Sequence, residues 1–421
     1  MRPAVAVGER WVVPGNRFDL LPAPSTPPEV TAVVLHYRDP ERLALVLAGL
    51  RRQTHPAPRL QVVVADDGSV PLPPVPDDVV LVTQEDRGFR AAAARNLGAA
   101  AADGEVLCFL DGDTVPEPGY VAAAVAWPAV GTDVLVVGRR RHTDLTGWGP
   151  DRLGAWFDGG PAPRELTEPR WLRDAYAGSR DLLDADDRSY RHVISAVLTV
   201  HRDLFAATGG FDPTFTGYGG EDWEFAHRAW VAGAVLAHRH DAVAWHDGPD
   251  WGEREGGTAA GRAQKERETA ELARRIPDHV ARGEGFVAAA PRLLAEVGGG
   301  TSEQRVGTVR ALLVAHPDTL LVTDGVTAAT VDDPRVVAEL PDRGTVQRIP
   351  YRVRVDAPAV VDDLGTVVDG LTGGDAGRVV TADGRVVVEA ARAVNRAARH
   401  GLPLERLFGT DSAPASGQET P

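Results

Sequence analysis

A short apolar run followed by two aspartates, DGEVLCFLDGDTVPEPG at residues 103–119, constrains this chain more than any other stretch. Val106–Leu110 is bounded by turn residues, a pattern typical of a central strand in a parallel sheet. Asp111 and Asp113 therefore follow at the carboxyl end of the strand, where open α/β sheets bind ligands. Two such carboxylates could share a divalent cation with a phosphate or a ribose. Asp-Gly-Asp is also a good turn, because both residue types suit tight backbone geometry.

Length and charge narrow the class of protein. The 421 residues exceed the usual size of one domain, which predicts two. The net charge of −15 disfavours nucleic acid as a partner. Cys108 is the only cysteine, which excludes an intrachain disulfide and fits a reducing compartment. The sequence shows no signal peptide and no run near the roughly 20 apolar residues of a membrane span, so we expect no transmembrane segment and a cytoplasmic location.

Strand and helix patterns alternate up to about residue 140. A proline-rich lead-in, residues 1–28, comes first. The expected elements after it are the strands Val30–Tyr37, Leu60–Ala65, Val79–Thr83, Val106–Leu110 and Val134–Gly138, and the helices Glu41–Arg52, one within 87–102 and Tyr120–Trp127. This alternation predicts an α/β fold with a mostly parallel sheet and helices on both faces.

The pattern weakens in residues 139–190, which we expect to be irregular but partly ordered, because disordered segments are poor in aromatic residues. It returns with a strand at Val193–His201 and a short helix near Asp203. The later expected elements are the helix Asp222–Ala232, the strand segments Ala234–His238 and Val243–His246, and a long amphipathic helix over Gly257–Ile276.

Beyond about residue 284 we expect a smaller α/β region. Its predicted elements are strands at Thr319–Thr323 and Val346–Val355, a hairpin turning at Asp383-Gly384, and a helix over Glu389–Arg399. The predicted organisation is a lead-in at 1–28, a main domain at 29–283 with halves at 29–140 and 141–283, an accessory domain at 284–409, and a disordered tail at 410–421.

Five motifs stand in one order along the first 250 residues. They are DDGS at 66–69, RGFRAAAARNLG at 87–98, DGD at 111–113, GGFDPTFTGYGGEDWEF at 209–225, and WH at 245–246. This order resembles the glycosyltransferases of the GT-A fold, family 2 in particular. The fourth motif resembles the galactosyltransferase-type module of polypeptide N-acetylgalactosaminyltransferases, β-1,4-galactosyltransferases and bacterial polysaccharide synthases. The resemblance covers about residues 30–250 and implies a hexosyltransferase that uses a nucleotide-diphosphate sugar.

The resemblance implies a metal site of three residues. Asp113 would bind the metal directly, Asp111 would reach the ribose or the metal through water, and His246 would complete the metal shell. Oxygen ligands suit Mg²⁺ or Mn²⁺, and Mn²⁺ accepts an imidazole better. The cation would balance the charge that grows on the diphosphate leaving group. His246 could instead be a histidine that simply ends a strand.

The resemblance also assigns the nucleotide. Tyr37 would stack on the base, and Asp67, or less readily Asp66, would accept the imide proton of uracil. Thymine presents the same edge, so UDP- and dTDP-sugars both remain open. Arg90 would lie near the base and diphosphate, and Arg95 is a further candidate. Each aspartate could instead cap a turn, and each arginine could lie on a solvated helix face.

Asp222 is the expected catalytic base. A hydroxyl acceptor must lose its proton as it attacks, and inverting relatives use this aspartate for the purpose. The retaining N-acetylgalactosaminyltransferases have asparagine there, so the aspartate favours inversion. A helix N-terminus should keep the pKa of Asp222 low, and the residue could also be a plain N-cap.

Acceptor recognition falls to the neighbours of this base and to aromatic side chains. Glu221 would hold the acceptor sugar, and the other expected acceptor residues are Tyr218, Gly220 and Trp223. Trp148, Trp156 and Trp171 could stack on a sugar or an aglycone, or could equally be core. The sequence leaves three acceptor classes open: a sugar, a lipid-linked sugar and a small molecule.

Two features depart from the family pattern, and both concern recognition. The stretch Ser195–Thr199 lacks an asparagine that many relatives carry, and the first strand ends in Leu35-His36-Tyr37. Two other functions compete with transfer. A nucleotidyltransferase should open with a glycine-rich phosphate loop, which the first strand does not reach. A sugar-binding protein without catalysis would need neither Asp222 nor a metal.

Overall fold

The aspartate-bearing strand lies in the middle of a nine-stranded sheet. The computed structural model describes residues 2–250, 258–278, 281, 290–359 and 364–412. Within this part, the strand order is β5-β4-β3-β6-β10-β8-β11-β7, and β9 pairs with β8. The strands are β3 (Val30–His36), β4 (Leu60–Asp66), β5 (Val80–Thr83), β6 (Val106–Asp111), β7 (Thr114–Pro116), β8 (Val134–Asp144), β9 (Arg164–Leu166), β10 (Val197–His201) and β11 (Val235–Asp247).

The sheet is mostly parallel, as expected. Strands β5, β4, β3 and β6 run parallel to one another, and β8 runs parallel to β11. Strand β10 is antiparallel to both β6 and β8, and thus joins the two halves. Every apolar residue of β6 is buried, because the strand has neighbours on both edges and helices over both faces. The α/β fold is therefore confirmed.

The expected helices of this sheet begin close to their predicted positions, and two further helices within residues 150–178 were not expected. The helices are α1 (Pro40–Arg51), α2 (Ala91–Ala100), α3 (Tyr120–Ala124), α4 (Pro150–Phe157), α5 (Arg170–Gly178), α6 (Arg202–Thr208), α7 (Glu221–Val231) and α9 (Ala259–Ala273). Helix α2 packs closely on β3 and β4 at Gly98. A Cβ atom there would lie 2.4 Å from a methyl carbon of Val33, so only glycine allows this approach.

Residues 139–190 are more regular than the sequence suggested. Strand β8 continues through the charged run to Asp144, and α4, β9 and α5 follow. The prediction failed because these elements are short and bury few side chains. Helix α4 buries Leu153, and α5 buries Leu172 and Tyr176. Such sparse apolar positions give little periodicity to detect.

Other boundaries also moved. Strand β10 begins at Val197, and the two expected segments after α7 are one strand, β11, with a register shift between Arg239 and Val243. The lead-in carries a small hairpin of β1 (Val5–Val7) and β2 (Arg10–Val12).

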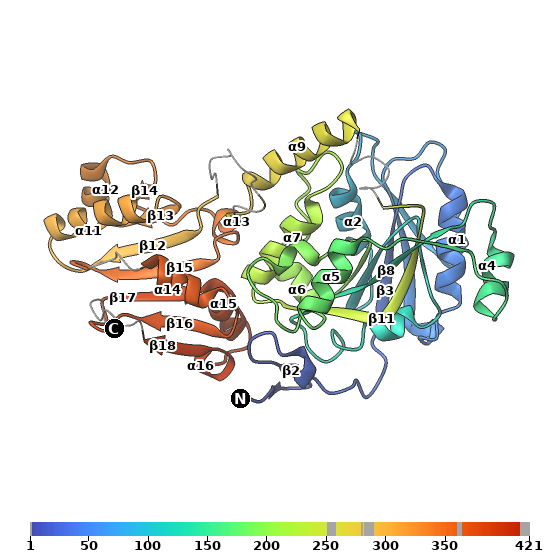
Figure 1. Cartoon of the computed structure of the whole chain (residues 1–421), viewed down its shortest axis with the longest axis horizontal. Coiled ribbons are helices and arrows are strands. Elements are labelled where there is room, and N and C mark those ends of the chain that lie inside the picture. The colour runs from blue at the N-terminus through green and yellow to red at the C-terminus, as the bar shows by residue number, and fades with distance from the viewer. Residues whose placement is uncertain (1, 251–257, 279–280, 282–289, 360–363, 413–421) are drawn as a thin grey trace.

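A second sheet of seven strands stands apart from the first (Figure 1). Its strands are β12 (Leu293–Gly298), β13 (Thr319–Val322), β14 (Val336–Val337), β15 (Tyr351–Asp356), β16 (Ala376–Val380), β17 (Val386–Ala390) and β18 (Gly409–Ser412), in the order β14-β13-β12-β15-β17-β16-β18. Its helices are α11 (Ser302–Ala315), α12 (Gly325–Val331), α13 (Arg343–Val346), α14 (Leu364–Leu371), α15 (Ala391–Arg399) and α16 (Leu404–Leu407).

The second sheet has its own apolar cluster, which the hairpin residue Val12 joins. We interpret the two sheets as two domains on this basis. The expected strand at 346–355 begins only at Tyr351, because α13 occupies residues 343–346. We expected the accessory domain to end at residue 409 and a disordered tail to follow. Residues 409–412 instead form β18, which pairs with β16. The rest of the expected tail lies outside the described residues.

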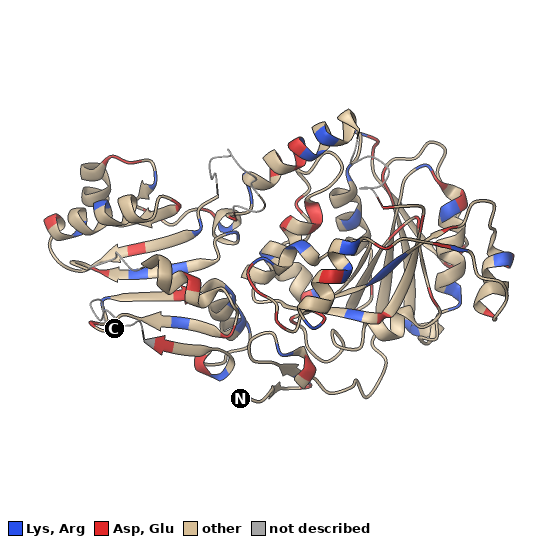
Figure 2. Cartoon of the chain, viewed as in Figure 1, with Lys and Arg blue, Asp and Glu red and all other residues tan. Residues whose placement is uncertain are grey.

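Acidic and basic residues are interspersed along the helices around both sheets (Figure 2). Among the described residues, none of the helices combines the length and apolar character needed to cross a bilayer.

One buried arginine joins the two sheets and the lead-in. Arg396 on α15 is fully buried, and burial lowers its pKa to about 10. Its guanidinium donates to the carbonyls of Gly233, 2.7 Å away, and of Ala234, 3.0 Å away. It also donates to the carbonyls of Val13 and Gly15 in the lead-in. The hydrogen bonds that these carbonyls would make with water are replaced by hydrogen bonds from one side chain.

Replacing Arg396 should therefore destabilise the whole chain. Arg396→Ala leaves several buried carbonyls without a donor, each at a cost of about 1–3 kcal/mol, so we expect a loss of about 3 kcal/mol or more in the free energy of unfolding. Chemical unfolding followed by circular dichroism measures this loss. The exposed Arg406 on α16 is the matched control, and Arg406→Ala should change stability by less than about 0.5 kcal/mol. Equal stability of the two variants would contradict this role of Arg396.

Candidate active site

A cavity of about 670 Å³ lies beyond the carboxyl ends of β3 and β6 and against the start of α7. Most of the residues expected at a site line it together: Tyr37, Asp111, Asp113, Tyr218, Gly220, Glu221, Asp222, Trp223 and His246. Asp66, Asp67 and Arg90 are not among its lining residues. The fold therefore brings together motifs that lie more than 200 residues apart in the sequence.

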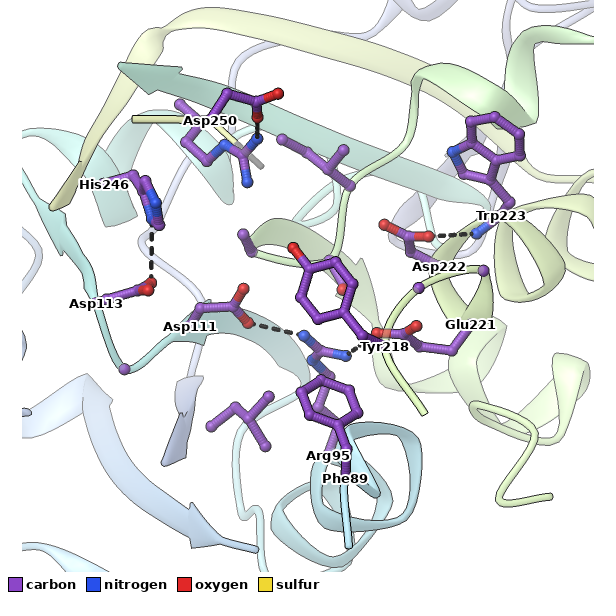
Figure 3. Close-up of a pocket in the computed structure, with 18 of the residues that line it drawn as sticks. Phe89, Arg95, Asp111, Asp113, Tyr218, Glu221, Asp222, Trp223, His246 and Asp250 are labelled. Atoms are coloured by element: carbon purple, nitrogen blue, oxygen red, sulfur yellow. Dashed lines mark hydrogen bonds and ion pairs between the residues drawn. The ribbon is translucent and has the colours of Figure 1, made fainter. Parts of the chain in front are cut away.

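Asp113 and His246 meet because two short strand segments pair. Strand β7 follows Asp113 and pairs with β11, which places Thr114 opposite His246. His246 Nδ1 lies 3.2 Å from Asp113 Oδ1 (Figure 3). Burial alone would raise the pKa of Asp113, but the hydrogen bond with His246 and the nearby positive charges of Arg42 and Arg140 lower it to about 2. The carboxylate is thus held ionised.

Gly112 explains the spacing of the two aspartates. A Cβ atom at this residue would lie 2.6 Å from the carbonyl oxygen of Leu35 on β3. A larger residue would push the chain away from the neighbouring strand. The glycine therefore lets Asp111 and Asp113 both reach the cavity while the strand ends stay close.

Arg95 joins the two sides of the cavity. Its guanidinium donates to Asp111 Oδ1 at 2.7 Å and to Glu221 Oε1 at 3.0 Å (Figure 3). Burial alone would lower the pKa of Arg95, but Asp111 and Glu221 together raise it well above its usual range. The arginine is a permanent cation that is 3% exposed. It was only an open candidate for nucleotide binding in the sequence, and it lies instead between two carboxylates.

The side chains of Asp113 and His246 are suitable ligands for a divalent cation, but they do not form a complete coordination shell. Among the described residues, no group of three or more His, Cys, Asp and Glu side chains is placed to hold a metal. Asp113 and His246 are adjacent, while Asp111 faces Arg95. A carboxylate next to an imidazole fits Mn²⁺ in particular. Of the three expected ligands, Asp113 and His246 are therefore in contact, while Asp111 is bonded to Arg95.

Asp222 differs from expectation in its pKa. The sequence predicted a low value from the helix N-terminus, but burial, and then the neighbouring charge of Glu221, raise the pKa of Asp222 to about 7. Helix α7 begins at Glu221 with Gly220 as its N-cap, so Asp222 lies in the first turn and is not the cap. Its carboxylate accepts one hydrogen bond, from the backbone N–H of Trp223 at 2.8 Å. Desolvation therefore outweighs the helix dipole here.

The loop before α7 is shaped by close contact with α9. Gly219 and Gly220 have φ angles of +95° and +93°, which favour glycine. A Cβ atom on Gly219 would lie 3.0 Å from the carboxylate of Glu268 on α9. Lys265 of the same helix lies 5.1 Å from the ring of Trp223. No pattern in the sequence indicated that α9 would line this cavity.

At the expected nucleotide end, Tyr37 is the exposed member. Its side chain is 43% exposed, and its hydroxyl donates to Asp86 at 3.2 Å. Asp66 is fully buried, and its carboxylate accepts hydrogen bonds within the chain from His36, Gly68, Ser69 and Thr83. This arrangement shapes the loop after β4.

Asp67 is also buried and internally bonded. It accepts hydrogen bonds from the side chain of Gln84 and from the backbone N–H of Arg90, the latter at 2.7 Å. These contacts tie the loop after β4 to the start of α2. Asp66 thus caps the turn after β4 through the backbone N–H groups of Gly68 and Ser69, while Asp67 bonds to residues outside that turn.

The aromatic candidates separate into two groups. Trp171 and Tyr218 line the cavity, and Tyr218 lies against Phe89, with 5.6 Å between the ring centroids. Trp148 and Trp156 pack against each other and against the apolar core beside α4. The sequence could not separate these groups, because all four tryptophan and tyrosine side chains suit both a core and a binding surface.

Known protein families match the part of the chain that forms the first sheet and lines the cavity. Residues 31–179 match the model of glycosyl transferase family 2, and residues 185–242 match the model described as the N-terminal domain of galactosyltransferase. Validoxylamine A glucosyltransferase of Streptomyces hygroscopicus subsp. jinggangensis is 33% identical over 236 residues, which cover 51% of this chain and 54% of the relative. Hyaluronan synthase of Pasteurella multocida is 26% identical over 255 residues, which cover 55% of this chain and 26% of the relative.

Two solved structures are also similar. A mannosyltransferase from Pyrobaculum calidifontis, in complex with GDP-Man and Mn²⁺, has a TM-score of 0.40 at 21% identity, covering 63% of this chain and 68% of that chain. GalNAc-T7 with UDP, GalNAc and Mn²⁺ has a TM-score of 0.37 at 16% identity, covering 54% of this chain and 45% of that chain.

The two matched models follow one another without overlap, in the order that the motifs predicted. They span β3 to β11 and include the DGD and GGED motifs, whose side chains meet at the cavity. The chain spans about half the length of the glucosyltransferase that it matches, and about a quarter of the synthase. Residues 31–179 are thus similar to the glycosyltransferases of family 2, and residues 185–242 are similar to the galactosyltransferase model that follows them.

Proposed function

We propose that this chain transfers a sugar from a UDP- or dTDP-sugar to a hydroxyl acceptor, with a divalent cation and with inversion at the anomeric carbon. The observation that carries the proposal is one cavity with two different carboxylate sites. Asp113 is ionised beside an imidazole on one side, and Asp222 has a pKa near 7 on the other. Two carboxylates whose environments separate their pKa values suit two separate tasks.

The first task is to bind the diphosphate end of the donor. Asp113 and His246 would hold the cation, and Asp111 would bind it through water or contact the ribose. When bound, Mn²⁺ or Mg²⁺ would supply the positive charge that stabilises the leaving diphosphate. Arg95 keeps Asp111 in place, because it holds one oxygen of that carboxylate at 2.7 Å.

The second task is to take the acceptor proton. A base with a pKa near 7 accepts a proton more readily than an ordinary aspartate does, and it is still largely ionised just above neutral pH. Glu221 is the neighbouring candidate for binding the acceptor sugar. One of its oxygens accepts a bond from Arg95, while the other is buried without a hydrogen-bond partner among the described residues. That oxygen is available to a substrate hydroxyl.

For the nucleotide, Tyr37 is the stronger of the proposed contacts, because it lines the cavity and is exposed. Asp67 and Arg90 support the same end indirectly by fixing the loop after β4. Direct contact of Asp66, Asp67 or Arg90 with the base stays a prediction. The acceptor belongs to a class that Tyr218, Gly220, Trp223 and Trp171 can contact, which fits a sugar ring or an aglycone.

Metal dependence tests the first task. Hydrolysis of UDP-glucose and other UDP- and dTDP-sugars is measured with and without Mn²⁺, together with transfer to an acceptor library. We expect activity that EDTA abolishes, and we expect Asp113→Ala to lose it and to bind UDP more weakly, because the diphosphate loses its counter-charge. Asp78→Ala, at an exposed site, is the control. Full activity in excess EDTA would exclude the metal, and binding without turnover by the wild type would favour a sugar-binding protein.

The preference for a nucleotide tests the donor. Calorimetric titration with UDP, dTDP and GDP in the presence of Mn²⁺ should show tighter binding of the two pyrimidine nucleotides. Tyr37→Ala should weaken all binding that depends on base stacking by about 1–3 kcal/mol. Tighter binding of GDP would contradict a pyrimidine donor.

Asp222→Asn tests the base. We expect kcat to fall by about 10²–10⁴-fold while UDP binding with Mn²⁺ is retained, because the amide cannot take a proton. In the wild type, kcat/KM should rise with pH through about 7, where Asp222 ionises, and the variant should lose this rise. NMR coupling constants of the product read its anomeric configuration. Retention, or a near wild-type rate in the variant, would show that Asp222 is not the base.

Asp222→Asn also tests how the free energy of unfolding depends on pH. Between the ordinary pKa of 3.8 and about 7, the native state holds a proton on Asp222 that the unfolded chain has lost. The wild type therefore loses stability as pH rises through this window. Asp222→Asn has no such loss and should be more stable than the wild type by about 2 kcal/mol at pH 8, and by nothing at pH 3.

A further inference from the structure

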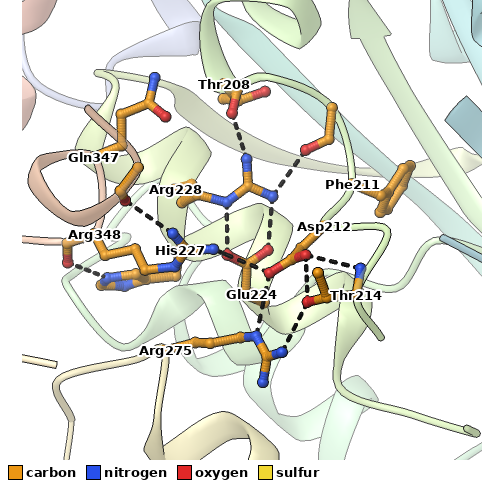
Figure 4. A network of polar contacts seen from close by, with 12 residues as sticks. Thr208, Phe211, Asp212, Thr214, Glu224, His227, Arg228, Arg275, Gln347 and Arg348 are labelled. Atoms are coloured by element: carbon orange, nitrogen blue, oxygen red, sulfur yellow. Dashed lines mark hydrogen bonds and ion pairs between the residues drawn. The ribbon is translucent and has the colours of Figure 1, made fainter. Parts of the chain in front are cut away.

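Helix α7 carries Glu221 and Asp222 in its first turn. Three buried polar residues, Glu224, His227 and Arg228, follow along the same helix and form a polar row (Figure 4). Glu224 in this row is fully buried, and Arg228, one turn later, is 5% exposed. Arg228 donates to both oxygens of Glu224, at 2.6 Å each. A buried carboxylate needs such partners, because an unpaired charge inside a protein is costly. The pair therefore compensates the buried charge of Glu224 within the helix.

The same arginine ties α7 to the GGFD turn. Arg228 donates to the carbonyl of Gly210 at 2.8 Å and to the carbonyl of Thr208. Asp212 follows in this turn and is 11% exposed in its side chain. Asp212 accepts hydrogen bonds from Thr214 and from Arg275, the latter at 3.2 Å. The loop from residue 209 to residue 220 brings Tyr218 and Gly220 to the cavity. Its first residues are held by a charged anchor, which consists of Arg228, Asp212 and Arg275.

One residue of the C-terminal region enters this anchor. Arg348 lies between α13 and β15, and its guanidinium Nη2 is 3.0 Å from Asp212 Oδ2 and 3.0 Å from Glu224 Oε1 (Figure 4). Its backbone carbonyl accepts a hydrogen bond from His227 Nε2 at 2.9 Å. Arg348 therefore holds both α7 and the loop before it, through its side chain and its backbone.

Helix α15 of the same region caps the other end of α7. Asn395 donates to the carbonyl of Val231 at 2.8 Å, and Arg399 donates to the carbonyl of Ala232. These carbonyls have no partner within the helix, because they belong to its last turn. Helix α7 is thus fixed by the C-terminal region at its middle and at its end, while its first turn remains at the cavity.

We propose that Arg348 is a positioning residue for the transfer reaction: the C-terminal region uses it to set the place of Asp222 and of the loop at residues 209–220. The inference rests on the proposed function of Asp222. It follows from the geometry, because Arg348 contacts the charged groups at the base of that loop and of α7 at once. A small shift of a catalytic group lowers the rate strongly even when the chemistry of the site is intact.

Arg348→Ala tests the proposal in the full chain. We expect kcat for transfer or donor hydrolysis to fall about ten-fold or more and KM for the acceptor to rise, with the affinity for UDP and Mn²⁺ unchanged, because the donor side of the cavity does not touch Arg348. The control is Arg343→Ala, an exposed arginine on α13 that leaves these contacts intact. If the alanine variant does not fold, Arg348→Gln carries the test, and Arg348→Lys should restore part of the loss through its charge. A wild-type kcat and acceptor KM in any folded Arg348→Ala or Arg348→Gln variant would overturn the proposal.

Hydrogen exchange read by mass spectrometry separates this inference from the proposed function. Peptides covering residues 209–224 should exchange faster in Arg348→Ala than in the wild type, and at the wild-type rate in Arg343→Ala. Unchanged exchange in Arg348→Ala would overturn the positioning role whatever the activity. A wild type without transfer or hydrolysis, together with faster exchange in the variant, would instead overturn the proposed function and leave the structural coupling in place.

Discussion

Arg95 lies buried between two carboxylates that come from opposite sides of the cavity, Asp111 at the end of β6 and Glu221 at the start of α7. A buried guanidinium needs such partners, and its planar group can serve two carboxylates at once. The distance between the strand ends and α7 therefore depends on this one side chain. The position of Asp222, the next residue of α7, follows from it. Without Arg95, Asp111 and Glu221 would lose the cation that holds them together.

Different neighbours give two acidic residues of the cavity different pKa values. Asp113 has positive neighbours and an imidazole partner, which together keep its carboxylate ionised. Asp222 has the charge of Glu221 beside it and a single backbone donor, so its proton is held more tightly. Both residues are aspartates near the end of a secondary-structure element. The difference between them comes from the neighbours that the fold supplies, and it leaves the cavity with one carboxylate of low pKa and one whose pKa is about 7.

The C-terminal region is more than an appendage to the first sheet. Arg348 reaches the polar row behind the first turn of α7, while Asn395 and Arg399 bind the carbonyls at its end. Arg396 extends these contacts to the lead-in. A helix held in this way has little freedom to shift, since each movement would leave buried charges or carbonyls unpaired. The region thereby stabilises the element on which the proposed chemistry depends.

The sequence by itself determined the α/β fold, the central strand with its two aspartates and the set of motifs that meet at the cavity. Those features are local: an apolar run marks a buried strand, and glycines next to charged residues mark strand and helix ends. Only the tertiary structure decided the rest. The short helices α4 and α5 bury too few side chains to show a period. Asp66 proved to be bonded to its own turn, and Asp67 to Gln84 and to the start of α2. The contact of Arg95 with Glu221 and that of Arg348 with Asp212 join residues more than 100 positions apart in the chain, and the pKa of Asp222 depends first on its burial. Charge interactions of this kind act through space, so no local pattern in the sequence records them.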